Sequence, residues 1–304
     1  MDNLGMVLVA LIAGALRVST PFLFVSLGEC LTEKAGRINL GNEGALVLGA
    51  MTAYAASYET GSPWLGVLAA MCAGGLLGLL HGAACSLARV NDIAMGIAVM
   101  LAGIGVAFFF GKPYIQPSAP QLPVIPLGFW SDSRQVSSAL NVSPLFFIGL
   151  LVAAFMAWAF KNTRTGLVVR IVGDSADAAR AMGLPIDRIR ILSTVAGSAL
   201  AGAGGSFLSL SYPGSWNEGL SSGQGLVAVA LVVFARWDPV ACVGAALLFG
   251  AAGALGPSLQ TIGVTQGYYL FYAAPYVLTL LIMILTVAPG RVLRGMPGEL
   301  SLTR

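Results

Sequence analysis

The sequence predicts an all-α integral membrane protein, a polytopic bundle of about nine (eight to ten) transmembrane helices, one of them short or broken. The first reason is composition: of 304 residues, 57% are hydrophobic and 10% are charged, and the mean hydropathy is +0.84. Soluble domains usually carry about 25% charged residues, so this chain has too few polar groups to cover a globular surface in water. The second reason is its 39 glycines, because glycine is commoner in membrane helices than in soluble ones. We therefore set aside a soluble protein with an unusually large core.

The third reason is a series of apolar runs, most of them near or above the ~20 residues that span the hydrocarbon core of a bilayer. They lie at 5–27, 40–57, 63–88, 92–111, 144–160, 189–211, 239–258 and 268–289. A shorter run at 223–235 suffices only for a tilted, partial or broken helix. Asp2 stands where a signal peptide carries basic residues, so we expect the first run to remain as a helix. No second soluble domain is visible, and residues 1–304 are expected to form a single transmembrane domain.

Lysine and arginine in short loops indicate the cytoplasmic side of a membrane protein. Six of them lie in the loop 161–190, at Lys161, Arg164, Arg170, Arg180, Arg188 and Arg190. The C-terminal tail adds Arg291, Arg294 and Arg304, and alternation of the crossings places Lys34, Arg37, Arg89 and Arg236 on the same side. We therefore expect a multi-pass protein of the bacterial inner (cytoplasmic) membrane, with loop 161–190 and the C-terminus in the cytoplasm. Segment 112–143, with Lys112 and Arg134 as its only positive residues, and the N-terminus should lie outside.

Three of the predicted helices carry small residues at every fourth position. These seams are Ser62, Gly66, Ala70, Gly74, Gly78, Gly82 and Ser86; Ser193, Gly197, Ala201, Gly205 and Ser209; and Ala246, Gly250, Ala254 and Ser258. Small residues at this spacing let helix backbones approach closely in lipid, where packing depends on van der Waals contact. The seams predict a tightly packed helical bundle, without indicating a particular function.

A polar, glycine-rich segment at 32–44 interrupts the apolar pattern. Asn39, Asn42 and Glu43 lead directly into an apolar run, and three glycines within nine positions argue against a regular first helical turn. Polar groups at membrane depth face the protein interior and often mark substrate pathways. In a second interpretation Glu43 lies at the membrane interface, where the helix dipole favours a carboxylate at a helix start. The sequence leaves both interpretations open.

A second segment, residues 172–185 in the basic loop, predicts a short capped helix. Asp174 or Ser175 can cap its N-terminus, with Asp177 in its first turn. Gly183 can supply the left-handed residue that ends the helix, and Pro185 prevents its continuation.

This capped helix would present Ala178, Ala181 and Met182 on one face. Asp187 is a candidate cap for the membrane helix that follows. A short helix held between two membrane spans is suited to docking another protein, although most such helices are ordinary connections.

No enzyme signature is present. Gly111-Lys112-Pro113 lacks both the upstream glycine and the Ser or Thr of a Walker A loop, so any ATP hydrolysis is expected on a separate chain. Cys30, Cys72, Cys85 and Cys242 lie in apolar stretches without metal-ligand spacing, and His81 is the only histidine. We therefore expect reduced, buried cysteines and no metal site. Membrane topology explains the basic loops, and we expect no nucleic-acid partner.

The polar segment and the capped helix resemble those of the permease family of bacterial ABC importers for branched-chain amino acids, simple sugars and nucleosides. Residues 32–50 are similar to the family's N-[IL]-G-x-E-G block, and residues 173–211 to its G-x-N-x-x-A-A-x-x-x-G-I coupling segment and the span after it. Residues 92–110 and 223–255 match further, so the resemblance covers most of the chain. The opening of the first block and the turn at 236–239 are closest to the nucleoside and simple-sugar subgroup.

The resemblance implies a permease subunit that works by alternating access and has no cofactor of its own, ATP and Mg being held by a partner ATPase. The substrate pathway would be bordered by Asn39, Asn42, Glu43 and Gln224. Coupling to the ATPase would fall to Asp174, Ser175, Ala178, Ala179, Met182 and Gly183. The implied partners are a second permease (commonly a different chain), an ATP-binding subunit with two nucleotide-binding domains, a periplasmic or lipoprotein substrate-binding protein, and membrane lipid.

The sequence departs from the family pattern at a few positions. Asp174-Ser175 stands where the family often has Glu-Asn, Met100 where it often has Asn, and Ala235 where it often has Gly. Met100 removes one expected polar contact, which leaves the substrate class open. The main alternative is a proton-coupled secondary transporter of a small polar solute, for which Glu43 would be the titrating carboxylate.

Overall fold

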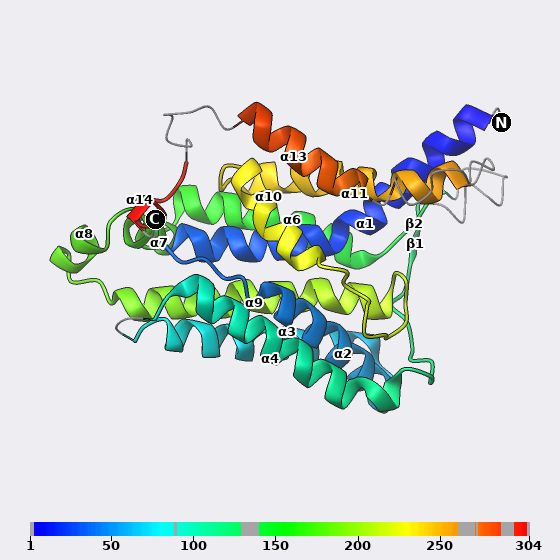
Figure 1. Cartoon of the computed structure of the whole chain (residues 1–304), viewed down its shortest axis with the longest axis horizontal. Coiled ribbons are helices and arrows are strands. Elements are labelled where there is room, and N and C mark those ends of the chain that lie inside the picture. The colour runs from blue at the N-terminus through cyan, green and yellow to red at the C-terminus, as the bar shows by residue number, and fades with distance from the viewer. Residues whose placement is uncertain are drawn as a thin grey trace.

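The computed structural model describes residues 3–87, 90–128, 140–260, 271, 273–286 and 295–302. Its helices are α1 (Asn3–Lys34), α2 (Asn42–Thr60), α3 (Pro63–Ala84), α4 (Asp92–Gly111), α6 (Pro144–Asn162), α7 (Arg164–Asp174), α8 (Ala176–Ala181), α9 (Ile186–Leu210), α10 (Gln224–Phe234), α11 (Pro239–Gln260), α13 (Ala274–Thr286) and α14 (Gly298–Leu302). A 3-10 helix, η1 (Lys112–Tyr114), follows α4, and the strands β1 (Ile125–Pro126) and β2 (Asn141–Val142) pair antiparallel. The long helices run along the longest axis of the molecule (Figure 1).

Six helices in the described ranges are long and apolar enough to cross a membrane: α1, α3, α4 with η1, α6, α9 and α11. The predicted helical membrane architecture is confirmed, whereas the count of nine crossings is not. The short run predicted at 223–235 forms α10, a helix of 11 residues. The last predicted crossing, 268–289, lies partly outside the described residues, and α13 forms within it.

The first helix extends beyond the apolar run at 5–27, because α1 continues to Lys34. Its last turns carry Glu29 and Glu33, which are 0% and 4% exposed. Hydropathy alone ends a span where charged residues begin. Here the helix continues because both carboxylates accept hydrogen bonds inside the bundle.

The contact between α1 and α9 lies at the centre of the bundle. A Cβ on Gly28 would lie 2.2 Å from the carbonyl oxygen of Gly197, and a Cβ on Gly197 would lie 2.5 Å from that of Gly28. Around this contact α3 packs on α9 and α11 packs on α1.

All three predicted seams of small residues make close backbone contacts. A Cβ added to Gly74 would lie 2.3 Å from the carbonyl oxygen of Ser198. A Cβ on Gly205 would lie 2.0 Å from that of Leu46, and a Cβ on Gly250 would lie 2.5 Å from that of Ala15. The predicted tight packing is therefore confirmed.

The four cysteines are unpaired, as expected. Cys30, Cys85 and Cys242 are buried, whereas Cys72 is exposed, contrary to the prediction. Cys72 lies on the side of α3 away from the seam that packs on α9.

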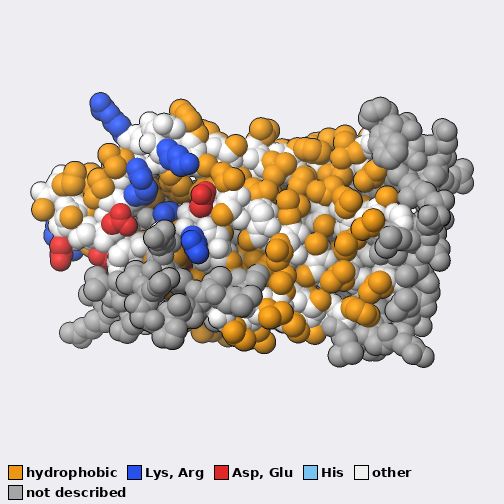
Figure 2. Space-filling view, turned by 90° about the horizontal axis from the view of Figure 1, so that it is seen from above, with side chains coloured by type: hydrophobic (Ala, Val, Ile, Leu, Met, Phe, Trp, Pro, Cys, Tyr) orange, Lys and Arg blue, Asp and Glu red, His pale blue; other side chains and the backbone are white. Residues whose placement is uncertain are grey.

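Charged side chains gather at one end of the molecule, and hydrophobic side chains cover most of the remaining described surface in view (Figure 2). We call the end that carries Lys34, Arg37, Arg180, Arg188 and Arg190 the basic end, and the opposite end, with η1 and the β1–β2 pair, the far end. Helices α7, α8 and α14 lie at the basic end (Figure 1). The side chains of Arg89, Arg134, Arg291, Arg294 and Arg304 lie outside the described residues.

Candidate transport and coupling sites

Helix α2 begins inside the bundle, after residues 35–41 return from the end of α1. A Cβ on Gly44 would lie 2.8 Å from the Cα of Met100, eight residues along α4 from its start at Asp92. At 1.5 Å of rise per residue, Gly44 in the first turn of α2 therefore lies about 12 Å along α4 from the start of α4 near the basic end. The prediction of an irregular first turn is wrong, because Gly44 already belongs to the helix. Its lack of a side chain serves the close approach of α4.

Four buried side chains form what we call the polar junction: Glu29, Asn39, Asn42 and Ser198. The Asn39 backbone N–H donates to Glu29 Oε1 (2.8 Å), and Asn42 Nδ2 donates to Glu29 Oε2 (2.7 Å). Asn39 Nδ2 donates to Ser198 Oγ (2.8 Å) and to Asn42 Oδ1 (3.1 Å). None of the four is more than 1% exposed. Because the bilayer core offers no water, such groups must be paired within the protein; the junction thereby connects α1, α2 and α9.

Glu43 lies beside this junction, between the starts of two helices. Its Oε1 accepts from the Ser221 hydroxyl (2.6 Å) and its Oε2 from the Gly225 backbone N–H (2.6 Å). It is 4% exposed, in the first turn of α2, while Gly225 is in the first turn of α10. Helix starts carry partial positive charge, which favours a carboxylate. The structure thus places Glu43 inside the bundle, where the dipoles of both helices act on it.

Gln224 is the first residue of α10 and is half-buried beside this contact. Its Oε1 is buried and has no hydrogen-bond partner within the described part of the chain. The structure therefore brings the predicted pathway residues Asn39, Asn42, Glu43 and Gln224 into one region. The first three already bind protein atoms, whereas Gln224 retains an unused acceptor.

Sequence reasoning missed several polar residues of this region. Glu29 and Glu33 are one helical turn apart, so they lie on the same face of a helix. This spacing would have indicated a polar helix face if the first span had been extended beyond residue 27. Glu33 accepts from the indole N–H of Trp237, which connects α1 to the turn after α10. Ser198 directly follows a seam residue and carried no distinct signal. Ser221 lies in a loop that nothing in the sequence connects to Glu43.

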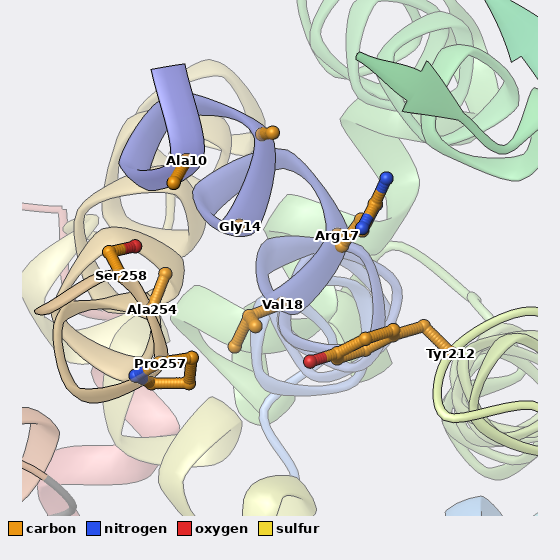
Figure 3. Close-up of a pocket in the computed structure, with 9 residues that line it drawn as sticks. Ala10, Gly14, Arg17, Val18, Tyr212, Ala254, Pro257 and Ser258 are labelled. Carbon is orange, nitrogen blue, oxygen red and sulfur yellow. The ribbon is translucent and has the colours of Figure 1, made fainter. Parts of the chain in front are cut away.

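A separate pocket of about 160 Å³ lies between α1, α11 and the end of α9 (Figure 3). Gly14, Ala254 and Ser258 lie on one side, and Tyr212 reaches toward α1 from the other (Figure 3). Arg17 Nε donates to the carbonyl of Asn141 (3.3 Å), which attaches β2 to α1. Arg17 and Glu29 are 12 residues apart on α1, about 18 Å at helical rise, so this pocket is not part of the polar junction.

Helix α8 has the predicted capped geometry. Ser175 is the N-cap, and its Oγ accepts from the Ala178 N–H (3.2 Å). Asp177 pairs with Arg180 at 2.8 Å, and Gly183 has φ +73°, as expected for the residue that ends the helix. Asp174, the other cap candidate, is instead the last residue of α7.

The exposure of α8 separates the predicted coupling residues into two groups. Ala178, Ala181 and Met182 are exposed, Met182 by 63%. Ala179 is 0% exposed, so it packs α8 against the protein and is not on its exposed surface. Asp187 is also not a cap, because Pro185 occupies that position and Asp187 follows in the first turn of α9.

Apolar spanning helices, two helices that start inside the bundle, and an exposed capped helix at the charged end define a membrane transport subunit. The chain belongs to the family of the branched-chain amino acid transport system / permease component, which matches residues 11–287. It is a permease component of an ABC transporter, and the family resemblance predicted from the sequence is confirmed.

Three relatives give the extent of the similarity. A putative glucose ABC transporter permease protein of Haloferax volcanii is 32% identical over 261 residues, 84% of this chain and 79% of that protein. The guanosine ABC transporter permease protein of Bacillus subtilis is 31% identical over 302 residues, 90% and 91% of the two chains. A nucleoside ABC transporter permease protein of Lactococcus lactis is 28% identical over 292 residues, again 90% and 91%.

Proposed function

We propose that this permease imports a neutral, hydroxylated solute of the nucleoside or simple-sugar class across the inner membrane. The observation that carries the proposal is the similarity over 90% of the chain to permeases named for guanosine and for nucleosides. ATP hydrolysis would take place on a separate subunit with two nucleotide-binding domains, which would hold ATP and Mg. A second permease and a periplasmic or lipoprotein binding protein would complete the importer.

The electrostatics of the two helix starts favour a neutral substrate. The N-termini of α2 and α10 would attract an anion at this depth, but the Glu43 carboxylate already occupies that position. A second negative charge beside Glu43 would be repelled. A solute with hydroxyl and amide groups can instead use hydrogen-bonding atoms such as the unpartnered Gln224 Oε1.

We propose that the basic end faces the cytoplasm, which its positive charges support; α8, α14 and the C-terminus would then be cytoplasmic. In this orientation the exposed Ala178, Ala181 and Met182 face the ATP-binding subunit. Substrate would arrive at the far end from the binding protein. Closure of the ATPase would push on α8. The pathway beside Glu43 and Gln224 would then open alternately to the outside and to the cytoplasm.

Reconstitution of the chain with its partners in proteoliposomes tests this function. The vesicle lumen corresponds to the cytoplasm and contains the ATP. We expect uptake of labelled guanosine, or of glucose, that requires this ATP and that continues after a proton ionophore is added. Uptake that needs a proton gradient and ignores ATP would favour the secondary transporter instead. ATP-driven uptake of a charged amino acid, with none of nucleoside or sugar, would contradict the substrate class while retaining the permease.

A further inference from the structure

The C-terminal helix α14 packs against the base of the coupling region. A Cβ on Gly298 would lie 2.2 Å from the carbonyl oxygen of Asp174, at the end of α7. Leu300 is 5% exposed and belongs to the same buried apolar cluster as Phe160 and Trp237. Figure 1 shows α14 beside α7, next to α8. This short helix is therefore held in place by packing.

Glu299 of α14 binds two other elements at once. Its Oε1 accepts from the backbone N–H of Ala176, the first residue of α8 (2.8 Å). Its Oε2 accepts from Arg190 Nη2 (3.0 Å), and Arg190 Nε donates to the carbonyl of Ala35 (3.2 Å). We call Glu299 and Arg190, with the Ala176 amide and the Ala35 carbonyl, the Glu299 clamp.

The clamp is shielded from water, as the Arg37–Asp92 pair is, and unlike the Asp177–Arg180 pair on α8. The Glu299 and Arg190 side chains are 18% and 14% exposed, whereas those of Asp177 and Arg180 are 93% and 71% exposed. Exposed pairs contribute little, because water and salt screen them. Shielded charge-assisted hydrogen bonds are stronger and more specific in geometry.

The clamp also reaches the segment that leads to the polar junction. Gly36 has φ +84°, and a Cβ there would lie 3.0 Å from the Cβ of Glu299. A Cβ on Gly173 of α7 would lie 2.1 Å from the carbonyl oxygen of Lys34. The end of α1, α7 and α14 thus have no space to move independently. Asn39, three residues beyond Gly36, is a member of the polar junction.

We propose that Glu299 is a positioning residue that transmits displacement of α8 to residues 35–41, and through them to the polar junction. This inference rests on the proposed coupling role of α8. Ala179 is the buried contact of α8 itself, whereas the clamp links the start of α8 to Ala35, the first residue after α1. Its loss should separate ATP hydrolysis from transport while leaving substrate recognition intact.

The test uses the complete importer in proteoliposomes and measures substrate carried per ATP hydrolysed. Glu299→Ala and Glu299→Gln are expected to lower this ratio about fivefold or more, the lower range of coupling between sites. The KM for substrate and the amount of ATPase subunit that co-purifies should stay at wild-type values. Glu59→Gln is the matched control, because Glu59 is exposed at the far end. Its carboxylate accepts a hydrogen bond from the Tyr114 hydroxyl, far from the clamp.

A second variant separates coupling from folding. Arg190→Gln combined with Glu299→Gln leaves no charge unpaired, so the complex should assemble. Because both residues act through one clamp, the double variant should be no more uncoupled than either single variant.

A wild-type ratio in Glu299→Ala or in the double variant would overturn the proposal, as would failure of the double variant to assemble, since Glu299 would then serve folding alone. Wild-type uptake without ATP would instead contradict the proposed function.

Discussion

The polar junction and helix α8 are both polar interruptions of an apolar chain, but they use their polar groups in opposite ways. In the junction, Glu29, Asn39 and Asn42 bind one another and are almost completely buried. On α8, Asp177 and Arg180 pair with each other while largely exposed to solvent, and Met182 is exposed. Polar groups enclosed by lipid-embedded helices must be paired, whereas an exposed helix leaves its surface free for a partner. Changes in the junction should therefore impair folding, and changes on α8 should impair coupling.

The largest effect is expected from Glu29→Ala. The Asn39 N–H and Asn42 Nδ2 would each lose an acceptor, at about 1–3 kcal/mol per buried group, so the free energy of unfolding should fall by about 2–6 kcal/mol. SDS titration of the purified chain in detergent micelles measures it. Glu59→Ala, on the exposed end of α2, should stay close to wild type. Equal losses in the two variants would contradict the contrast.

Glu43→Gln should have the next largest effect. In the structure both the Gly225 N–H and the Ser221 hydroxyl donate to Glu43. The replacement keeps the size of the side chain, but its amide N–H₂ cannot accept, so one of these two donors would lose its acceptor. Loss of a charge-assisted hydrogen bond costs about 1.5–3 kcal/mol, and transport should fall with it. Glu43→Asp, which retains the charge, should recover part of both. Unchanged stability and uptake in Glu43→Gln would show that the two helix starts do not depend on this carboxylate.

Gly205→Ala tests the packing that encloses the junction. Its added methyl group would lie 2.0 Å from the Leu46 carbonyl oxygen, and overpacking of this kind costs about 1–3 kcal/mol. The same substitution at Gly244, where a Cβ meets nothing within 4 Å, is the control and should be neutral or slightly stabilising. Thermal unfolding of both variants in one detergent compares them. A Gly205→Ala protein as stable as Gly244→Ala would mean that the seam tolerates helix separation.

Asp177→Ala should have the smallest effect on stability. The Asp177–Arg180 pair is almost fully exposed, and pairs of this type contribute well under about 1 kcal/mol. The melting temperature should not change, and raising the salt concentration should have the same effect on variant and wild type. A large loss of stability would show that α8 is held by its charges rather than by Ala179 and the Glu299 clamp.

The sequence predicted those features that depend on local chemistry. The Ser175 cap, the left-handed Gly183 and the small-residue seams follow from residue type and spacing, and the structure contains each of them. Hydropathy placed the end of α1 too early, because it does not register that Glu29 and Glu33 find donors in the fold.

Long-range pairing could not be predicted. Ser221 and Glu43 are 178 residues apart in the chain, and only the packing of α2 beside α10 brings them together. The burial of Ala179 likewise depends on how α8 folds back onto α7 and α9, which its own sequence does not specify.

The most direct test of the central claim is site-specific cross-linking from α8 in the assembled importer. A photo-reactive residue at Met182, which is 63% exposed at the basic end, should cross-link to the ATP-binding subunit. The same residue at Tyr58, which is 44% exposed at the far end of α2, should not. Cross-linking to the ATP-binding subunit from Met182 alone is the predicted result. No product from Met182, or equal products from both positions, would contradict the assignment of α8 as the docking element.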